Sequence, residues 1–294
     1  MNLIGEFSIQ IPTATLQPGQ ESFPCYIFPL VIDGPSRFVG GAVVDTTPGL
    51  HHANIVTRKK QSDVMRKCTK AENQGSEAID VVKGGSVLFA SSTQHVGSEW
   101  QRFPDGMAFK VPDDQEIIAR MHYINSTPMP LTLSPTYRWY LVDATKVTRE
   151  IAPFAWNYGD INLPPLKVTT HTGDCTMPDA MHIVSLLPHM HRLGIEFAAR
   201  YKGGPLDGKY FLRSKGYDPD NGVLLQSHPA IDLGQGDGAT FSCTWDNTLN
   251  ETLGFGVGNN EMCILFGYAW PPWAAFTADA KAGNCFTIAP VPPP

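Results

Sequence analysis

His189 and His191 have a spacing that allows two side chains to bind one metal ion. They precede Arg192-Leu193-Gly194 and then an alternating apolar and polar segment, Ile195–Tyr201. Because residues i and i+2 of a β-strand project from the same face, both imidazoles can reach one ion. From this pair alone, the alternative is two exposed histidines at the rim of a strand.

A second pair, His51 and His52, is adjacent in sequence. Neighbouring residues of a regular strand point to opposite faces, so this pair chelates a metal only where the backbone bends. Pro48-Gly49, just before the pair, offers such a bend. Taken alone, the pair is weak support for a metal site.

His122 and Met262 are ordinary residues when each is considered alone. A single histidine in a strand is usually a core or rim residue, and a methionine in an apolar segment is usually a core residue. Arg120 precedes His122 by two residues and shares its strand face. Arg120 therefore either lines a cleft or is solvated.

Together, these residues occur in an order that resembles the copper type II, ascorbate-dependent monooxygenases. That family includes peptidylglycine α-hydroxylating monooxygenase and dopamine β-monooxygenase, and the resemblance covers nearly the whole chain. The segments that carry it are Pro48–His52, Pro104–Pro112, Arg120–Tyr123, Pro188–Gly194 and Asn260–Cys263. A bacterial or divergent member is expected, because the N-terminal half has fewer cysteines than the animal enzymes.

The resemblance implies two copper ions per chain. His51, His52 and His122 would hold one in the N-terminal half, while the catalytic residues His189, His191 and Met262 would hold the other. Imidazole suits copper, and the soft thioether favours Cu(I). The implied activity is hydroxylation of a C–H bond with O2 and a one-electron reductant such as ascorbate. The alternative is a copper-binding or carrier protein with the same fold and no oxygenase activity.

The pocket beside the second copper is expected to be apolar. Where the peptidylglycine enzyme binds a substrate carboxylate, this chain has Leu187, Ile264 and Phe266, none of which can pair with a charge. With Trp270, they suggest a small apolar or aromatic substrate. The other possibility is that Ile264 and Phe266 are core residues.

Six cysteines without a CxxC pair favour disulfides, and therefore a secreted or periplasmic protein. The resemblance implies the pairs Cys175–Cys285 and Cys243–Cys263. Cys25 and Cys68 remain and are paired by elimination. Asn125–Thr127 and Asn250–Thr252 match the acceptor motif for N-glycosylation, which matters only in a eukaryotic secretory pathway.

Composition, with glycine and proline spread along the chain, predicts an all-β protein. Hydrophobic residues make up 42%, enough for packed cores, while 27 glycines and 25 prolines suit short strands joined by turns. The net charge of −6 and the absence of long apolar runs argue against nucleic acid and against a membrane span. Strands are expected at Phe7–Ile11, Ser86–Phe89, Glu116–His122, Leu131–Leu141, Ile195–Tyr201 and Cys263–Trp270, and a helix near Gln61–Lys67.

The expected architecture is two tandem antiparallel β-sandwich domains of the jelly-roll type. The polar stretch Asp143–Glu150 separates them. The N-terminal copper-binding domain would span residues 1–148. The C-terminal copper- and substrate-binding domain would span residues 149–294.

Overall fold

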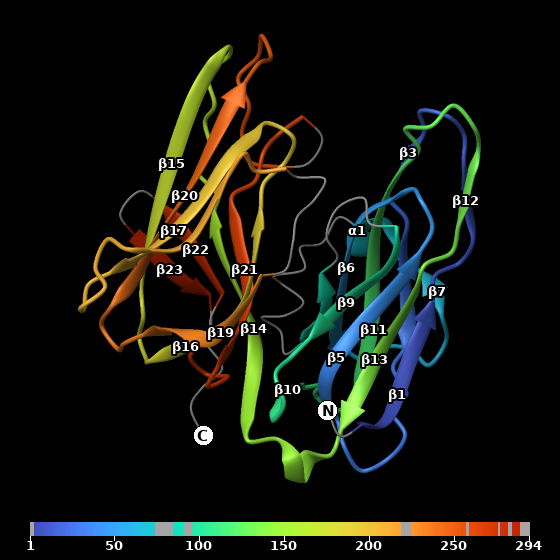
Figure 1. Cartoon of the computed structure of the whole chain (residues 1–294). Helices are drawn as coiled ribbons and strands as arrows, with labels where there is room; N and C mark the ends of the chain where they lie inside the picture. Colours follow the sequence, from blue (N-terminus) through green and yellow to red (C-terminus); the bar gives the residue numbers. More distant parts are fainter. Residues whose placement is uncertain are drawn as a thin grey trace. The chain divides into compact units, whose positions relative to one another are not determined.

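The computed structural model describes residues 3–73, 85–90, 96–218, 225–256, 259–275, 277–281 and 284–288 (Figure 1). The side chains of residues 90, 226–228, 281 and 284–288 lie outside the description. Strands dominate the described residues, which confirms the all-β class. The chain divides into unit 1, Met1–Glu150, and unit 2, Ile151–Pro294, two residues beyond the boundary expected from the sequence.

In unit 1, one sheet has the order β1-β13-β5, and β9 and β10 also pair with β5 (Figure 1). Its strands are β1 (Leu3–Gln10), β5 (Phe38–Thr46), β9 (Gly97–Arg102), β10 (Met107–Lys110) and β13 (Thr136–Val142).

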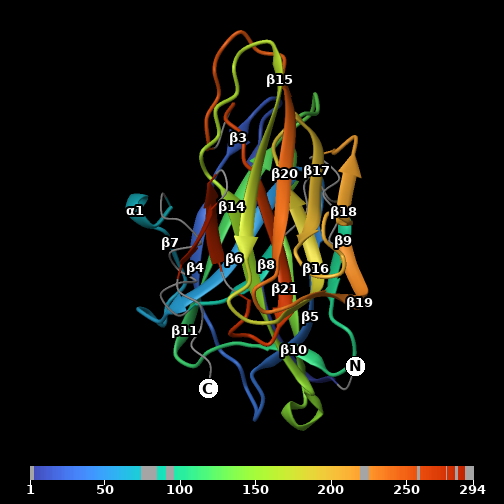
Figure 2. The same cartoon turned by 90° about the vertical axis from the view of Figure 1, so that its left-hand side faces the viewer.

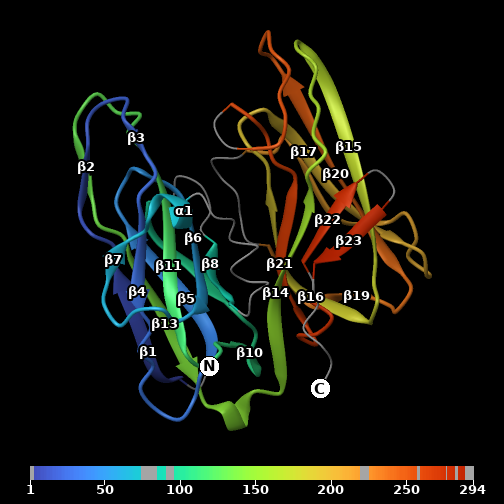
Figure 3. The same ribbon diagram turned by 180° about the vertical axis from the view of Figure 1, so that it is seen from behind.

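The other main sheet of unit 1 has the order β7-β4-β11-β6-β8, with β3 also paired to β11 (Figure 3). Its strands are β3 (Glu21–Ser22), β4 (Cys25–Pro29), β6 (Leu50–Lys59), β7 (Arg66–Lys67), β8 (Val87–Ala90) and β11 (Gln115–Ile124). A small ladder joins β2 (Ala14–Leu16) to β12 (Leu131–Leu133).

The core of unit 1 lies between these sheets. Trp139 of β13 is fully buried and stacks on Phe7 of β1, with ring centroids 4.9 Å apart. Its indole N–H donates to the Leu88 carbonyl of β8 in the other sheet, at 2.9 Å. One side chain thus bridges both layers and satisfies its only polar atom.

Unit 2 also has two main sheets. One of them has the strand order β15-β20-β17-β18 (Figure 2). Those strands are β15 (Lys167–Thr176), β17 (Gly194–Lys202), β18 (Tyr210–Lys215) and β20 (Gly238–Asn247). The other sheet contains β14 (Arg149–Tyr158), β16 (Met181–His189), β19 (Leu225–Leu233), β21 (Ile264–Trp270), β22 (Thr277–Lys281) and β23 (Asn284–Ile288). Trp156, Phe197 and Trp245 are fully buried in the core of unit 2.

Most of the predicted strands are present, as β1, β8, β11, β17 and β21. The predicted strand Leu131–Leu141 is instead two strands, β12 and β13. Pro135 between them has no N–H for a ladder. Its carbonyl accepts from the Ile11 N–H, and Ser134 Oγ donates to the Ile11 carbonyl at 2.6 Å. These two hydrogen bonds stabilise the irregular backbone between β12 and β13.

The predicted helix at Gln61–Lys67 is wrong. The backbone N–H groups of Gln61 and Ser62 donate to the carboxylate of Glu116, both at 3.0 Å, and Arg66 and Lys67 form strand β7. Arg66 and Lys67 pair with Ile27 and Tyr26 of β4, and this strand pairing excludes a helix over the same residues. The described helices are α1 (Lys70–Asn73) and the 3₁₀ turn η1 (Ala144–Lys146).

A buried asparagine forms the same corner in each unit. Asn125 Nδ2 donates to the carbonyls of Leu16 and Met129, and Asn247 Nδ2 donates to those of Leu163 and Glu251. Both asparagines are fully buried. The Asn125 amide is therefore buried and hydrogen-bonded to the backbone, whereas Asn250, in the other glycosylation motif, is exposed.

Candidate metal centres

A β-bulge places His51 and His52 on the same side of β6. In the pairing of β6 with β11, His122 faces His52, but the next residue, Tyr123, faces Leu50. His51 is thus an extra residue without a register partner, and a bulge lets two adjacent side chains share one side. Pro48-Gly49 does form a turn, just before β6, and the bulge at His51 follows it.

The three histidines of unit 1 converge. One ring nitrogen from each of His51, His52 and His122 lies within 4.8 Å of the others. The ring centroids are 4.7–5.1 Å apart, and His122 is nearly perpendicular to both of its neighbours. Nitrogens bound to one metal at about 2 Å lie roughly 3–4 Å apart, so small side-chain rotations would complete a three-nitrogen set.

Two residues cover the outer side of His122. Glu21 Oε1 is 2.6 Å from His122 Nε2. The Phe23 ring stacks on the imidazole, with centroids 4.3 Å apart and planes at 17°. Sequence patterns did not single out either residue, because both belong to a different strand region and approach His122 only through the pairing of β3 with β11.

In unit 2, His189 ends β16 and His191 follows it. The two rings are 5.2 Å apart and nearly perpendicular. His189 faces Ile264, the first residue of β21, so Met262 precedes the paired residue by two positions. His191 Nδ1 lies 2.8 Å from the Asn260 carbonyl. That contact places Met262 within two residues of an atom that touches His191.

The Asn260 carbonyl also settles which nitrogen of His191 can bind a metal. A carbonyl oxygen only accepts, so Nδ1 of His191 carries the proton and donates. Nε2 of the neutral ring then keeps its lone pair. A ligand histidine typically has such a partner on its other nitrogen, which orients the ring.

Glu261, which the sequence analysis missed, ties the ligand segments of unit 2 together. Its buried carboxylate accepts from the backbone N–H groups of His191 (2.8 Å) and Leu193 (2.9 Å) and from the Trp245 indole (2.9 Å). Burial raises the pKa of the Glu261 carboxyl. The only signal in the sequence was a single acid within an apolar segment, directly before Met262.

The disulfides Cys25–Cys68 and Cys243–Cys263 are both present, as expected. The second bridge begins one residue after Met262 and ties that segment to β20. The expected pair Cys175–Cys285 involves a side chain outside the described residues.

The residues expected to line a substrate pocket lie on one face of unit 2. Leu187 faces Phe266 across β16 and β21, His189 faces Ile264, and His182 faces Trp270. Directly opposed residues share a sheet face. Phe266 lies 6.2 Å from His189, measured between ring centroids.

The opposite face of β21 packs into the core. The core residues of this strand are Leu265 and Ala269, which alternate with Ile264 and Phe266. Ile264 and Phe266 therefore lie on the histidine side rather than in the core of unit 2. At the end of β21 away from His189, Trp270 stacks on His182, with ring centroids 3.7 Å apart. His182 Nδ1 lies 2.5 Å from Asp232 Oδ1.

The sequence matches no known family model and no curated protein. Among solved structures, the major capsid protein P2 of bacteriophage PM2 is similar at 10% identity and a TM-score of 0.38, over 96% of this chain and 100% of that one. VP54 of PBCV-1, fitted into a reconstruction of the virophage Sputnik, is similar at 8% identity and a TM-score of 0.31, over 90% and 93%. Because both TM-scores are below 0.5, neither likeness carries a functional argument.

No helix in the described part of the chain is both long and apolar enough to cross a membrane.

Proposed function

We propose that this chain is a copper-dependent monooxygenase built from two tandem jelly-roll-like β-sandwich domains. It would hydroxylate a C–H bond of a small apolar or aromatic substrate, using O2 and a one-electron reductant such as ascorbate. The observation that carries the proposal is the convergence of His51, His52 and His122, because the bulge in β6 lets adjacent histidines share one side and three ring nitrogens lie close together.

The donor sets fit copper. Three imidazoles suit a copper ion in unit 1, and two imidazoles with the Met262 thioether suit Cu(I) in unit 2. Copper held by these residues would supply the one-electron redox chemistry that O2 activation requires. The overall balance is one C–H bond, O2, two electrons and two protons giving one C–OH bond and water.

The protein's own contribution in unit 2 is orientation. Asn260 and Glu261 hold the His191 ring and backbone, which keeps Nε2 of His191 free to bind. Leu187 and Phe266 provide an apolar surface next to His189. Such a surface holds a hydrocarbon or aromatic group and offers no partner for a carboxylate.

A secreted or periplasmic location belongs to the same proposal. Two disulfides are compatible with an oxidising compartment, where such bonds persist.

The test is copper per chain by elemental analysis after loading and desalting. We expect two ions in the wild type, about one in His189→Ala and about one in His122→Ala. His171→Ala is the matched control and should keep two, because His171 bonds to Asn162 instead. Zero or one ion in the wild type would refute the two-site proposal.

A second measurement separates an oxygenase from a copper carrier. Oxygen uptake with ascorbate is followed with a panel of small apolar and aromatic compounds, and hydroxylated product is detected by mass spectrometry. Product that disappears in His189→Ala supports the monooxygenase. Two bound copper ions without substrate-coupled oxygen uptake would instead indicate the carrier.

A further inference from the structure

Two contacts of His122, with Glu21 and with Phe23, bear on which of its ring nitrogens could bind a metal. The Glu21 carboxylate oxygen accepts, so Nε2 of His122, 2.6 Å away, donates its proton to it. Of the two ring nitrogens, Nδ1 is then the one that could bind a metal. The stacked Phe23 ring restricts rotation of the imidazole about its Cβ–Cγ bond.

Strand pairing brings Glu21 and Phe23 to this place. Glu21 faces Ile124 through the pairing of β3 with β11, and Cys25 faces Arg120 through the pairing of β4 with β11. Phe23 lies between these two pairings, at the level of His122. The position of this short segment therefore sets the position of both outer partners.

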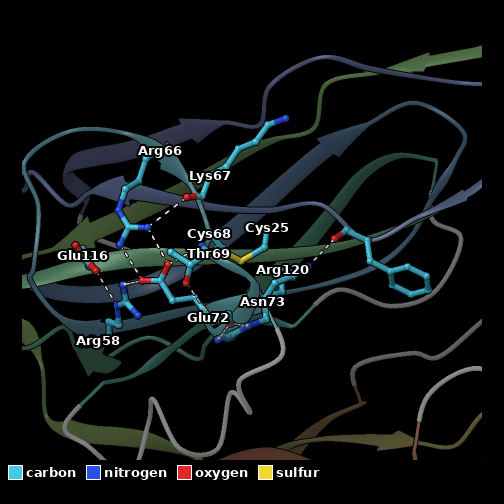
Figure 4. The surroundings of a disulfide bond; sticks show 11 residues. Cys25, Arg58, Arg66, Lys67, Cys68, Thr69, Glu72, Asn73, Glu116 and Arg120 are labelled. Atoms are coloured by element: carbon cyan, nitrogen blue, oxygen red, sulfur yellow. Dashed lines mark hydrogen bonds and ion pairs between the residues drawn. A yellow bond between two sulfur atoms is a disulfide. The ribbon is translucent and has the colours of Figure 1, made fainter.

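Helix α1 braces the segment (Figure 4). Asn73 Nδ2 donates to the Phe23 carbonyl at 3.2 Å, and Arg120 donates twice to the Glu72 carbonyl, at 3.0 and 3.3 Å. The sequence left open whether Arg120 lines a cleft or is solvated. These contacts show that it attaches α1 to the strand that carries His122.

A helix of four residues is not stable alone, so α1 depends on its anchors. Thr69 and Glu72 form a reciprocal capping box at its start. The Glu72 carboxylate also pairs with Arg66 and Arg58. The Cys25–Cys68 disulfide joins the residue before the capping box to β4 (Figure 4).

We propose that Glu21 and Phe23 are positioning residues that present Nδ1 of His122 to the copper of unit 1, and that the disulfide-anchored helix α1 holds them in place. Carboxylate–histidine–metal arrangements orient the ring and raise the basicity of the ligand nitrogen. This inference rests on the proposed function, since it requires copper at His51, His52 and His122.

The test uses the full chain with His189→Ala, which leaves the site of unit 1. Cu(I) affinity is measured by competition with a chromophoric chelator, and the Cu(II) form is examined by EPR. Glu21→Ala should still bind one copper, about 10- to 100-fold more weakly and with an altered EPR spectrum. Glu21→Gln should recover much of the loss, because its amide oxygen still accepts from Nε2. The exposed Glu6→Gln is the matched control.

The outcomes separate the two ideas. If the His189→Ala parent binds no copper, the proposed function fails. If the parent binds copper and Glu21→Ala has unchanged affinity, the positioning role is wrong. Complete loss of copper in Glu21→Ala would also overturn it, because Glu21 would then be a ligand.

The anchoring half of the inference has its own variants. Asn73→Ala removes a single hydrogen bond to Phe23, and the double variant Cys25→Ala/Cys68→Ala removes the disulfide. Both should weaken Cu(I) binding, the double variant more, and thermal unfolding checks that each is folded. If the double variant does not fold, Asn73→Ala decides, and unchanged affinity in it would remove α1 from the mechanism.

Discussion

Replacing Glu261 by glutamine tests how the second ligand set is held. One carboxylate oxygen accepts from both the His191 N–H and the Trp245 indole, and the other accepts from the Leu193 N–H. A glutamine oxygen can keep the first two bonds. Its NH2 group must then face the Leu193 N–H, which leaves a buried donor opposite another donor.

The expected cost follows from that single replacement. Losing a hydrogen bond to a charged group costs about 1.5–3 kcal/mol, and relief from burying a charge offsets part of it. We expect a loss of about 2 kcal/mol in the free energy of unfolding of unit 2. For a unit of this size, that lowers Tm by roughly 4–8 °C.

The same variant should weaken binding of the copper ion proposed for unit 2. The lost bond fixes the turn after His191, so its loosening should reduce Cu(I) affinity by about tenfold. Calorimetry and chelator competition measure the two effects. Glu251→Gln is the control, since Glu251 is an exposed acid of the same region. If Glu261→Gln matched the wild type in both Tm and affinity, the bridging role of this carboxylate would be refuted.

Three other predictions concern single residues. Met262→Ile should keep part of the copper but lose most substrate-coupled oxygen uptake, and full activity would remove the thioether from the ligand set. The Arg66 guanidinium, together with Arg58, holds the pKa of the Glu72 carboxyl well below its usual range, so this group stabilises the fold above about pH 4.5 and the stability is lost as pH falls below that value. Thermal unfolding between pH 7 and pH 3 should therefore show a smaller acid loss in Glu72→Gln than in the wild type, and equal losses would contradict the assignment. Expression in a eukaryotic secretory pathway should add glycan at Asn250 only, so Asn250→Gln should remove the mass shift, and glycan left on that variant would contradict the burial of the Asn125 amide.

The fold was predictable where local patterns carry it. Burial alternates along most of β13 and β20, which reflects one buried face per strand, and that period appears in the sequence. The segment Gln61–Lys67 was mispredicted because Arg66 and Lys67 pair with Ile27 and Tyr26 of β4, about forty residues earlier in the chain. No local window contains that partner.

The candidate sites follow the same division. The i and i+2 spacing of His189 and His191 predicted that their rings could approach each other, and the centroids lie 5.2 Å apart although only His189 belongs to a strand. The convergence of His51 with His52 depends on the register of β6 against β11. That register cannot be predicted from the residues next to the pair in the sequence. Glu21 was invisible for the same reason, because its contact with His122 exists only once β3 pairs with β11.

The two candidate sites differ in what holds them, and the difference has a consequence. In unit 1, the ligands lie within paired strands, and the accessory contacts come from a short helix anchored by a disulfide. In unit 2, His191 and Met262 lie beyond the strand ends; one buried carboxylate holds the turn at His191, and the Cys243–Cys263 disulfide begins one residue after Met262. Many backbone hydrogen bonds along paired strands hold the histidines of unit 1, whereas the turn at His191 depends on one carboxylate. Single substitutions around the ligands should therefore disturb the site of unit 2 more than that of unit 1.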